Sequence, residues 1–290
     1  MSIVVTGASG HLGRLTIENL LERGVPASEI TATARAVDRL HDLAERGVAV
    51  CVADYAHPAS LRAAFQGADR LLLVSGHLVP DRVAQHRNVV EAARDAGIGL
   101  LAYTSIVNAD TSGMLIAEDH VATEALIADS GLPFVLLRNN WYHENYTASI
   151  PTYLQHGTVI GSAGDGLVSA AARADYAQAA AEILTGQGHE NRTYELGGEP
   201  AFTLTQLAAQ VTEQSGTTVR YSDLPETDHA RALAEAGLPQ PLAQMVVDAD
   251  QAIRRGAMHT DSGDLNRLLG RPTTPLAAAI AAALPAPVEA

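Results

Sequence analysis

The stretch SIVVTGASGHLG, residues 2–13, opens the chain with an apolar strand and a turn that spaces its glycines as G-x-x-G-x-x-G. Gly7 permits a tight turn, Gly10 lets the backbone approach a phosphate, and Gly13 lets the following helix sit close to the strand. The free N–H groups at the start of that helix attract anions. The stretch therefore predicts a dinucleotide-phosphate site, with a purely structural turn as the alternative. The expected cofactor contacts here are Thr6, Gly7, Ser9, Gly10, His11, Leu12 and Gly13.

Beyond this turn, predicted strands and helices alternate through the first half of the chain. The strands are continuous apolar runs, which is typical of a parallel sheet that helices cover on both faces. With right-handed crossovers, this order predicts an α/β fold built on a doubly wound, Rossmann-type parallel sheet. The predicted strands are 2–7, 29–35, 48–55, 70–76, 99–105 and 133–139, and the predicted helices are 11–24, 37–47, 59–67, 81–97 and a segment around 117–130.

The alternation ends after Arg138, where an irregular polar and aromatic segment begins. We expect residues 1–138, together with 168–186, to form the NADP(H)-binding Rossmann domain, and residues 139–290 to form a smaller, mainly helical substrate-binding domain. Local signals in this second half are a helix over 173–186 with Asp175 as its N-cap, a capping box at 203–206 opening a helix to Ser215, a short strand at 218–224, and Thr274-Pro275 as the cap and first residue of a last helix.

The composition excludes several classes of partner. The 33 acidic residues against 19 Lys and Arg give a formal net charge of −14, a field that repels nucleic-acid phosphates. Cys51 is the one cysteine, which excludes an intramolecular disulfide and favours a reducing compartment. The apolar run at 276–284 is too short to cross a membrane, and the N-terminus lacks a signal-peptide pattern. We expect a cytoplasmic protein with no nucleic-acid or membrane partner.

The end of the second predicted strand indicates which dinucleotide is bound. NAD sites usually place Asp or Glu there to accept hydrogen bonds from the ribose 2′-hydroxyl, whereas this chain has Arg35. A guanidinium forms paired, charge-assisted hydrogen bonds with a 2′-phosphate, so NADP(H) is favoured. The alternative is that Arg35 is only a solvated charge at the strand end.

Other residues follow the third and fourth predicted strands, at the edge where the cofactor crevice runs. Asp54 either meets the adenine amino group or caps the helix that begins near Pro58. Ser75, Gly76 and His77 are expected to lie along the cofactor, although His77 also fits an ordinary surface-loop histidine.

The usual proton-transfer residues of a short-chain dehydrogenase are absent. Many of these enzymes use a Ser together with a Tyr-x-x-x-Lys pair, in which Lys lowers the pKa of Tyr. Here Ser105 matches the Ser, but Ile116 and His120 take the Tyr and Lys places. The missing pair argues against the usual carbonyl–alcohol chemistry. His120 and Glu124 make a single His/Glu pair, which we interpret as solvated or structural, so no metal site is expected.

Several longer stretches carry a resemblance to a known family. TGASGHLG, the strand end at Arg35, QHRNVVEAARDAGI, AYTS, LLRNNWYHENY, DYAQAAAEIL, YELGGEPAFTLTQLA and LGRPTT together resemble the NmrA-like, atypical short-chain dehydrogenases. Within that group the chain is most similar to the bacterial type 2 NAD(P)H:quinone oxidoreductases, nearly from end to end. The resemblance implies NADPH as the cofactor and quinones as electron acceptors, without flavin or metal.

Quinone reduction agrees with the missing Tyr–Lys pair. Hydride transfer to a quinone leaves a phenolate-like oxygen that its own ring stabilises, so positioning and one or two hydrogen-bond donors suffice. Tyr142 and Asn145 are the candidate donors, and Asn140 is expected to help seat the nicotinamide. The alternative for Tyr142 is a small aromatic core with Trp141 and Tyr146 between the two domains.

A second function stays open at this point. The NmrA-like group also contains redox sensors, which bind a dinucleotide without turning it over and act through a protein partner. Both functions need the glycine turn, so the turn does not separate them. The sequence also leaves the oligomeric state open, with a homo-oligomer possible.

Overall fold

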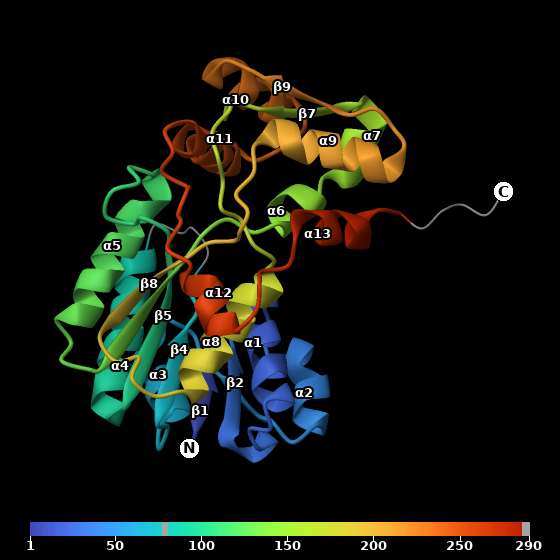
Figure 1. Ribbon diagram of the computed structural model, residues 1–290. Helices are drawn as coiled ribbons and strands as arrows, with labels where there is room; N and C mark the ends of the chain where they lie inside the picture. The colour runs from blue at the N-terminus through green and yellow to red at the C-terminus, as the bar shows by residue number, and fades with distance from the viewer. Residues whose placement is uncertain (77–80, 286–290) are drawn as a thin grey trace.

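Seven strands form one parallel sheet within residues 1–76 and 81–285, the part of the chain that the computed structural model describes (Figure 1). They are β1 (Ile3–Val5), β2 (Ile30–Ala34), β3 (Ala49–Val52), β4 (Arg70–Leu73), β5 (Leu100–Ile106), β6 (Phe134–Asn139) and β8 (Arg192–Leu196). Their order across the sheet is β3-β2-β1-β4-β5-β6-β8, and Val4 of β1 pairs with Thr31 on one side and Leu71 on the other. The chain therefore reverses direction across the sheet at β1 and β4, as the doubly wound prediction requires.

Helices cover both faces of this sheet. One face packs against α1 (His11–Glu22) and α8 (Arg173–Thr185), with α12 (Asp264–Leu269) beside them, and the other packs against α3 (Pro58–Phe65), α4 (Arg82–Ala96) and α5 (Leu115–Ala128). Shorter helical turns lie at η1 (Ala27–Glu29), η2 (Asp38–Leu40) and α2 (His41–Glu45). β1, β2, β4, β5 and β6 are mostly buried between these layers, which is why they read as continuous apolar runs, whereas the edge strands β3 and β8 are largely exposed or half-buried.

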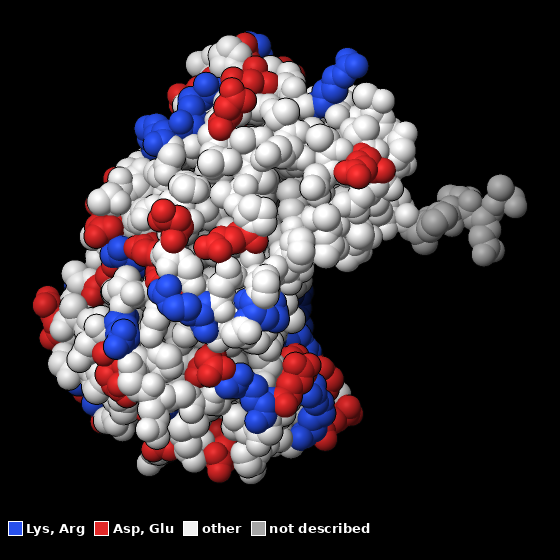
Figure 2. Space-filling model, in the orientation of Figure 1, with Lys and Arg blue, Asp and Glu red and all other residues white. Residues whose placement is uncertain are grey.

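The second half of the chain builds a smaller part above the carboxyl ends of the strands (Figure 1). It contains α6 (Glu144–Thr147), α7 (Ile150–His156), β7 (Thr158–Gly161), α9 (Leu204–Ser215), β9 (Arg220–Asp223), α10 (Glu226–Glu235), α11 (Gln240–Arg254) and α13 (Leu276–Ala283). β7 and β9 form a two-stranded parallel sheet, and this part has a core of its own around Val159, Leu207 and Ile253. Figure 2 shows the surface hollowed between the overhanging part with α9 and α13 and the part with α1 and α2.

The structure corrects several local expectations. β7 and β8 were not predicted; β8 joins the main sheet beside β6. The N-cap of α8 is Ala172, not Asp175, whose carboxylate is instead buried against Arg271. The last helix begins at Leu276, because Pro275 is its N-cap. The capping box at the start of α9 is confirmed: the Thr203 hydroxyl accepts the N–H of Gln206, and the Gln206 side chain accepts the N–H of Thr203.

The division into two domains stays a prediction. β8 and α12 come from the second half of the chain but pack with the Rossmann sheet. We therefore propose that the Rossmann part takes in Arg192–Leu196 and Asp264–Leu269 besides residues 1–138 and 168–186.

Candidate functional site

The turn between β1 and α1 has the geometry of a phosphate cradle. Gly7 has a φ of +61°, in the left-handed region that favours glycine, and its carbonyl accepts the N–H of Gly10 at 2.9 Å. A Cβ on Gly13 would lie 2.6 Å from the Gly7 carbonyl oxygen, so only glycine fits where α1 passes the turn. The first turn of α1 carries neither a side-chain cap nor an acidic residue. Its N–H groups are therefore suited to an anion.

The remaining predicted residues of this turn divide between the surface and the interior. Ser9 and His11 are exposed, whereas Leu12 is buried in the core. The Thr6 hydroxyl is fully buried, donates to the Leu72 carbonyl and accepts the Val74 N–H. Thr6 therefore ties β1 to the end of β4 with its side chain.

Arg35 and Asp54 lie just beyond β2 and β3. Arg35 is exposed and makes no side-chain hydrogen bond or ion pair with the described residues. Asp54 accepts the N–H of Ala56 at 2.9 Å and contacts His57 Nδ1 at 3.0 Å. The Ala56 N–H first, and then the neighbouring His57 and Arg35, hold the pKa of Asp54 below its usual value. Asp54 thus closes the turn before α3, whereas the N-cap of α3 itself is His57.

The turn after β4 is held from beneath by a buried network. Ser75 donates its N–H to the Thr104 hydroxyl at 2.8 Å, and Gly76 donates its N–H to His86 Nε2 at 3.1 Å. Because Nε2 accepts, the proton of His86 is on Nδ1, which bonds to the Thr123 hydroxyl at 2.9 Å. Burial first, and then the charge of Arg82, lowers the pKa of His86 to about 3, so this histidine stays neutral. His77 lies outside the described residues.

At the places of the usual Ser and Lys, the side chains of this protein form hydrogen bonds with other buried groups. Ser105 donates to Glu124 at 2.5 Å, and Glu124 pairs with Arg138 at 2.7 Å. His120 is buried, accepts from Arg82 at 2.5 Å and bonds to the Tyr103 hydroxyl at 2.7 Å.

Burial lowers the pKa of His120 well below its usual value. Ile116 is half-buried and apolar. The structural interpretation of the His120 and Glu124 pair fits this burial, and nothing at these places acts as a Tyr–Lys pair does.

The end of β6 carries two adjacent asparagines with different surroundings. The Asn140 amide donates to the Met258 carbonyl at 3.0 Å and accepts the Trp141 N–H at 2.7 Å, so its side chain fastens the later chain to the sheet. Asn139 is 5% exposed, and its Oδ1 has no hydrogen-bond partner among the described residues. Sequence reasoning named Asn140 and missed Asn139, because the sequence does not show which amide the fold leaves unpaired.

Tyr142 is the predicted donor whose surroundings are most specific. Its ring meets the ring of Tyr176 edge-on, with centroids 5.3 Å apart, and the Arg173 guanidinium carbon lies 4.6 Å from its centroid. Burial raises the pKa of Tyr142, while the neighbouring Asn139 side chain and the Arg173 charge oppose that rise. Tyr142 therefore keeps its hydroxyl proton at neutral pH and is able to donate it in a hydrogen bond.

The residues on either side of Tyr142 in this segment have different surroundings. Trp141 and Tyr146 pack on the core of the smaller part, whereas Tyr142 packs on the core of the sheet. Asn145 is exposed on α6. The three aromatic residues therefore do not form one cluster.

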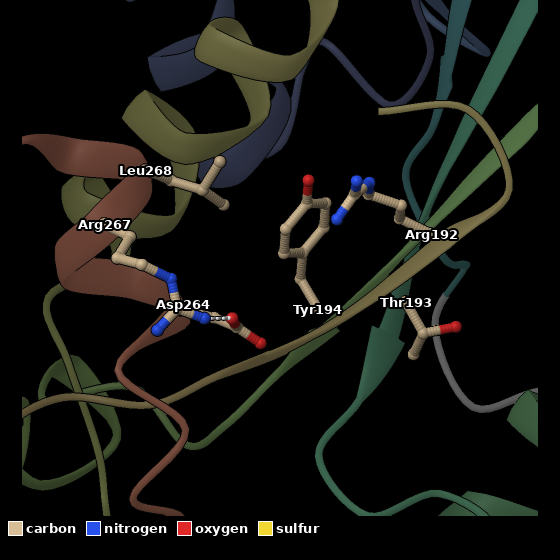
Figure 3. Close-up of a pocket in the computed structure, with 6 residues that line it drawn as sticks. All are labelled: Arg192, Thr193, Tyr194, Asp264, Arg267 and Leu268. Atoms are coloured by element: carbon tan, nitrogen blue, oxygen red, sulfur yellow. Dashed lines mark hydrogen bonds and ion pairs between the residues drawn. The ribbon is translucent and has the colours of Figure 1, made fainter. Parts of the chain in front are cut away.

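A surface pocket of about 340 Å³ lies apart from all of these residues, between β8 and α12. Figure 3 shows Arg192 and Tyr194 on β8 facing Leu268, with Arg267 paired to Asp264. The pocket shares no residue with the predicted site. Among the described residues, no three His, Cys, Asp or Glu side chains are grouped to hold a metal ion. No helix in that part of the chain has the length and apolar character needed to span a membrane.

The fold and the glycine turn define a Rossmann-type dinucleotide-binding protein. Residues 7–187 match the model of the family described as NAD(P)H-binding, and the chain belongs to that family. It is 49% identical over 278 residues to Quinone oxidoreductase 2 of Escherichia coli K12, covering 96% of this chain and 97% of that protein.

Two solved structures are similar over nearly their whole length. The NADPH-dependent quinone oxidoreductase QOR2 of Escherichia coli, in complex with NADPH, is 48% identical with a TM-score of 0.94, covering 97% of this chain and 99% of that one. The triphenylmethane reductase of Citrobacter sp., in complex with NADP(H), is 38% identical with a TM-score of 0.93, covering 98% of this chain and 100% of that one. The resemblance predicted from the sequence motifs is confirmed.

Proposed function

We propose that this protein is an NADPH-dependent quinone oxidoreductase. The observation that carries the proposal is the likeness to the NADPH complex of the Escherichia coli quinone oxidoreductase, which extends over 97% of this chain at 48% identity. The alternative, a sensor that binds the dinucleotide without turnover, shares the fold and the glycine turn but has no observation of its own to favour it.

The residues present fit NADPH. The close approach of Gly13 to the Gly7 carbonyl leaves the start of α1 open to a pyrophosphate, and the uncapped N–H groups there supply the donors. The exposed guanidinium of Arg35 would hold the 2′-phosphate. Ser75 and Gly76, fixed by Thr104 and His86, would line the crevice beside the ribose. When bound, NADPH supplies a hydride.

The acceptor would lie at the end of β6. There Tyr142 offers a neutral hydroxyl, and the buried Asn139 amide keeps an unpaired oxygen beside it. A hydrogen-bond donor such as this hydroxyl, placed at the quinone oxygen, stabilises the negative charge that develops there during reduction. We keep Asn145 as a second, more exposed donor, while the two internal hydrogen bonds of Asn140 favour a structural role for its amide.

A matrix of cofactors and acceptors tests this function. NADPH and NADH are each combined with several quinones and with simple aldehydes, and the absorbance of the reduced nicotinamide is followed. We expect steady oxidation of NADPH with quinones and none with aldehydes, because the Tyr–Lys pair is absent. Binding of NADPH without turnover of any quinone would instead support the sensor.

The quinone is the small-molecule partner that this proposal implies. The lone cysteine and the acidic charge fit a cytoplasmic protein that binds no nucleic acid, which we retain as part of the proposal. A homo-oligomer also stays a prediction.

A further inference from the structure

Several charged groups gather around the first turn of α8, next to Tyr142. Both oxygens of Glu144 accept the backbone N–H of Arg173, at 3.0 and 3.1 Å. Asp175 is fully buried and pairs with Arg271 at 2.8 Å. The guanidinium of Arg173 is different: in the described part of the chain it has no hydrogen-bonded acceptor and no carboxylate within 4 Å. The Arg173 guanidinium therefore forms no ion pair among the described residues, although the Glu144 carboxylate lies on the backbone of the same residue.

Tyr142 holds this charge at a defined place. The Arg173 guanidinium lies over the Tyr142 ring at 4.6 Å from its centroid, within the range of a cation–π contact. The Tyr142 ring is itself braced by the edge of Tyr176, which is 1% exposed. Arg173 is half-buried, so its charge is screened less than that of an exposed arginine.

A second observation points to a ligand at the same tyrosine. Asn139 is more than nine-tenths buried, and its Oδ1 lacks a partner among the described residues. Buried polar atoms are almost always hydrogen-bonded, so an unpaired one marks a place that water or a ligand completes. Asn139 is also close enough to Tyr142 to oppose the rise of its pKa. Tyr142 is therefore contacted by an amide with one unpaired oxygen and by a guanidinium that forms no ion pair.

We propose that Arg173 is a specificity-determining residue, which makes the acceptor site favour quinones that carry an anionic substituent such as a sulfonate or carboxylate. The inference rests on the proposed function, since it takes Tyr142 to face the acceptor. The net charge of −14 repels anions at long range, so an anionic acceptor needs a local cation to be admitted. The unpaired guanidinium offers the anionic substituent charge-assisted hydrogen bonds.

A pair of quinones with the same ring system tests the inference. The probes are 1,2-naphthoquinone-4-sulfonate and uncharged 1,2-naphthoquinone, each with saturating NADPH. The proteins are the wild type, Arg173→Gln, Arg173→Lys and the control Arg220→Gln, which changes an exposed arginine on β9. The quantity compared is the ratio of kcat/KM for the sulfonate to kcat/KM for the uncharged quinone, so that a general loss of activity cancels.

We expect this ratio to fall about tenfold in Arg173→Gln, the effect of losing one hydrogen bond to a charged group. Arg173→Lys should keep part of the preference, and Arg220→Gln should keep all of it. Added salt should lower the ratio in the wild type but not in Arg173→Gln. An unchanged ratio in Arg173→Gln overturns the inference. If the KM for NADPH rises while the ratio stays unchanged, Arg173 contacts the cofactor instead of the acceptor.

Equilibrium binding separates this inference from the proposed function. Calorimetry measures the dissociation constant of naphthalene-1-sulfonate in the presence of NADP⁺, without any turnover. Binding about tenfold weaker in Arg173→Gln than in the wild type supports the anion preference, even if no quinone is reduced. Equal binding in the two proteins overturns it, even if quinone reduction is established.

Discussion

The turn after β1 and the segment after β6 both end strands of the same sheet, yet they are built in different ways. In the turn, the decisive contacts are local: Gly7 and Gly13 touch each other through the backbone six residues apart. In the segment, Asn140 is fixed by Met258 and Tyr142 by Arg173, from distant parts of the chain. A site whose contacts are made by the backbone of residues close in sequence can be predicted from that sequence. A site whose contacts are made by side chains far apart in sequence cannot.

The largest effect on NADPH affinity should come from disturbing the close approach of Gly13 to Gly7. In Gly13→Val, the new side chain meets the Gly7 carbonyl oxygen, which an added Cβ alone approaches to 2.6 Å. Because the cradle must open, we expect NADPH affinity to fall by roughly 100-fold or more, from overpacking of a few kcal/mol. NADPH binding followed by fluorescence titration measures it. The control Gly24→Ala adds a Cβ where no atom lies within 4 Å, and it should leave NADPH affinity unchanged.

Substitution of Arg35 tests whether the residue just beyond β2 selects NADPH over NADH. Arg35→Ala should weaken NADPH binding by roughly 30-fold, through the loss of a charge-assisted contact, and should weaken NADH binding far less. The two dissociation constants are compared in the same titration. Equal losses for NADPH and NADH would remove the argument that Arg35 selects the 2′-phosphate.

Tyr142 tests the chemistry of the segment after β6. Tyr142→Phe removes the hydroxyl but keeps the ring that packs on Tyr176. We expect kcat with an uncharged quinone to fall at least about tenfold, since a donor to developing negative charge is lost, with the KM for NADPH little changed. Steady-state kinetics provide both values. An unchanged kcat would return Tyr142 to a packing role.

Asn140 tests the structural role of its amide. Asn140→Ala removes one of the two donors to the Met258 carbonyl, which keeps the Ser169 N–H, and it removes the acceptor of the Trp141 N–H. The free energy of unfolding should fall by about 1–3 kcal/mol. Chemical denaturation measures this loss. Arg35→Ala is the comparison, because its exposed side chain should contribute little to stability. If Asn140→Ala is as stable as the wild type, its amide is free for a ligand after all.

The smallest effect should come from a local motif outside the site. Thr203→Ala removes the hydroxyl that caps α9, and it should reduce the free energy of unfolding by about 1 kcal/mol. Thermal unfolding measures the change, and the dissociation constant of NADPH should not move. A change in NADPH affinity would mean that α9 is coupled to the cofactor crevice.

The main sheet was predicted wherever its strands are apolar runs. β1, β2, β4, β5 and β6 are apolar runs because helices cover them on both sides, and the edge strand β3 is apolar although no residue of it is buried. β8 was missed because it is an edge strand: Arg192 and Thr193 are exposed, and Leu196 is its one fully buried residue. A strand that is mostly polar carries little periodic signal, and its place in the sheet depends on pairing with β6.

The buried network beneath the turn after β4 shows the same limit. His86 lies in α4 and Thr123 in α5, 37 residues apart, and neither spacing nor composition connects them. Helix packing sets them 2.9 Å apart and aims His86 at the Gly76 N–H. The sequence shows two polar residues on separate helices, and the tertiary structure makes them one support for the turn after β4, where we propose that the cofactor lies.

By itself the sequence determined the parallel sheet, the glycine turn and the absence of a Tyr–Lys pair, and it predicted the 2′-phosphate contact that we propose for Arg35. Each of these depends on residue type at short spacing, because backbone geometry and burial act locally. Only the tertiary structure decided that Asn139 keeps an unpaired oxygen while Asn140 does not, and that the Arg173 guanidinium lies over Tyr142 without forming an ion pair among the described residues. Those outcomes depend on which distant groups reach each side chain, and packing alone settles that.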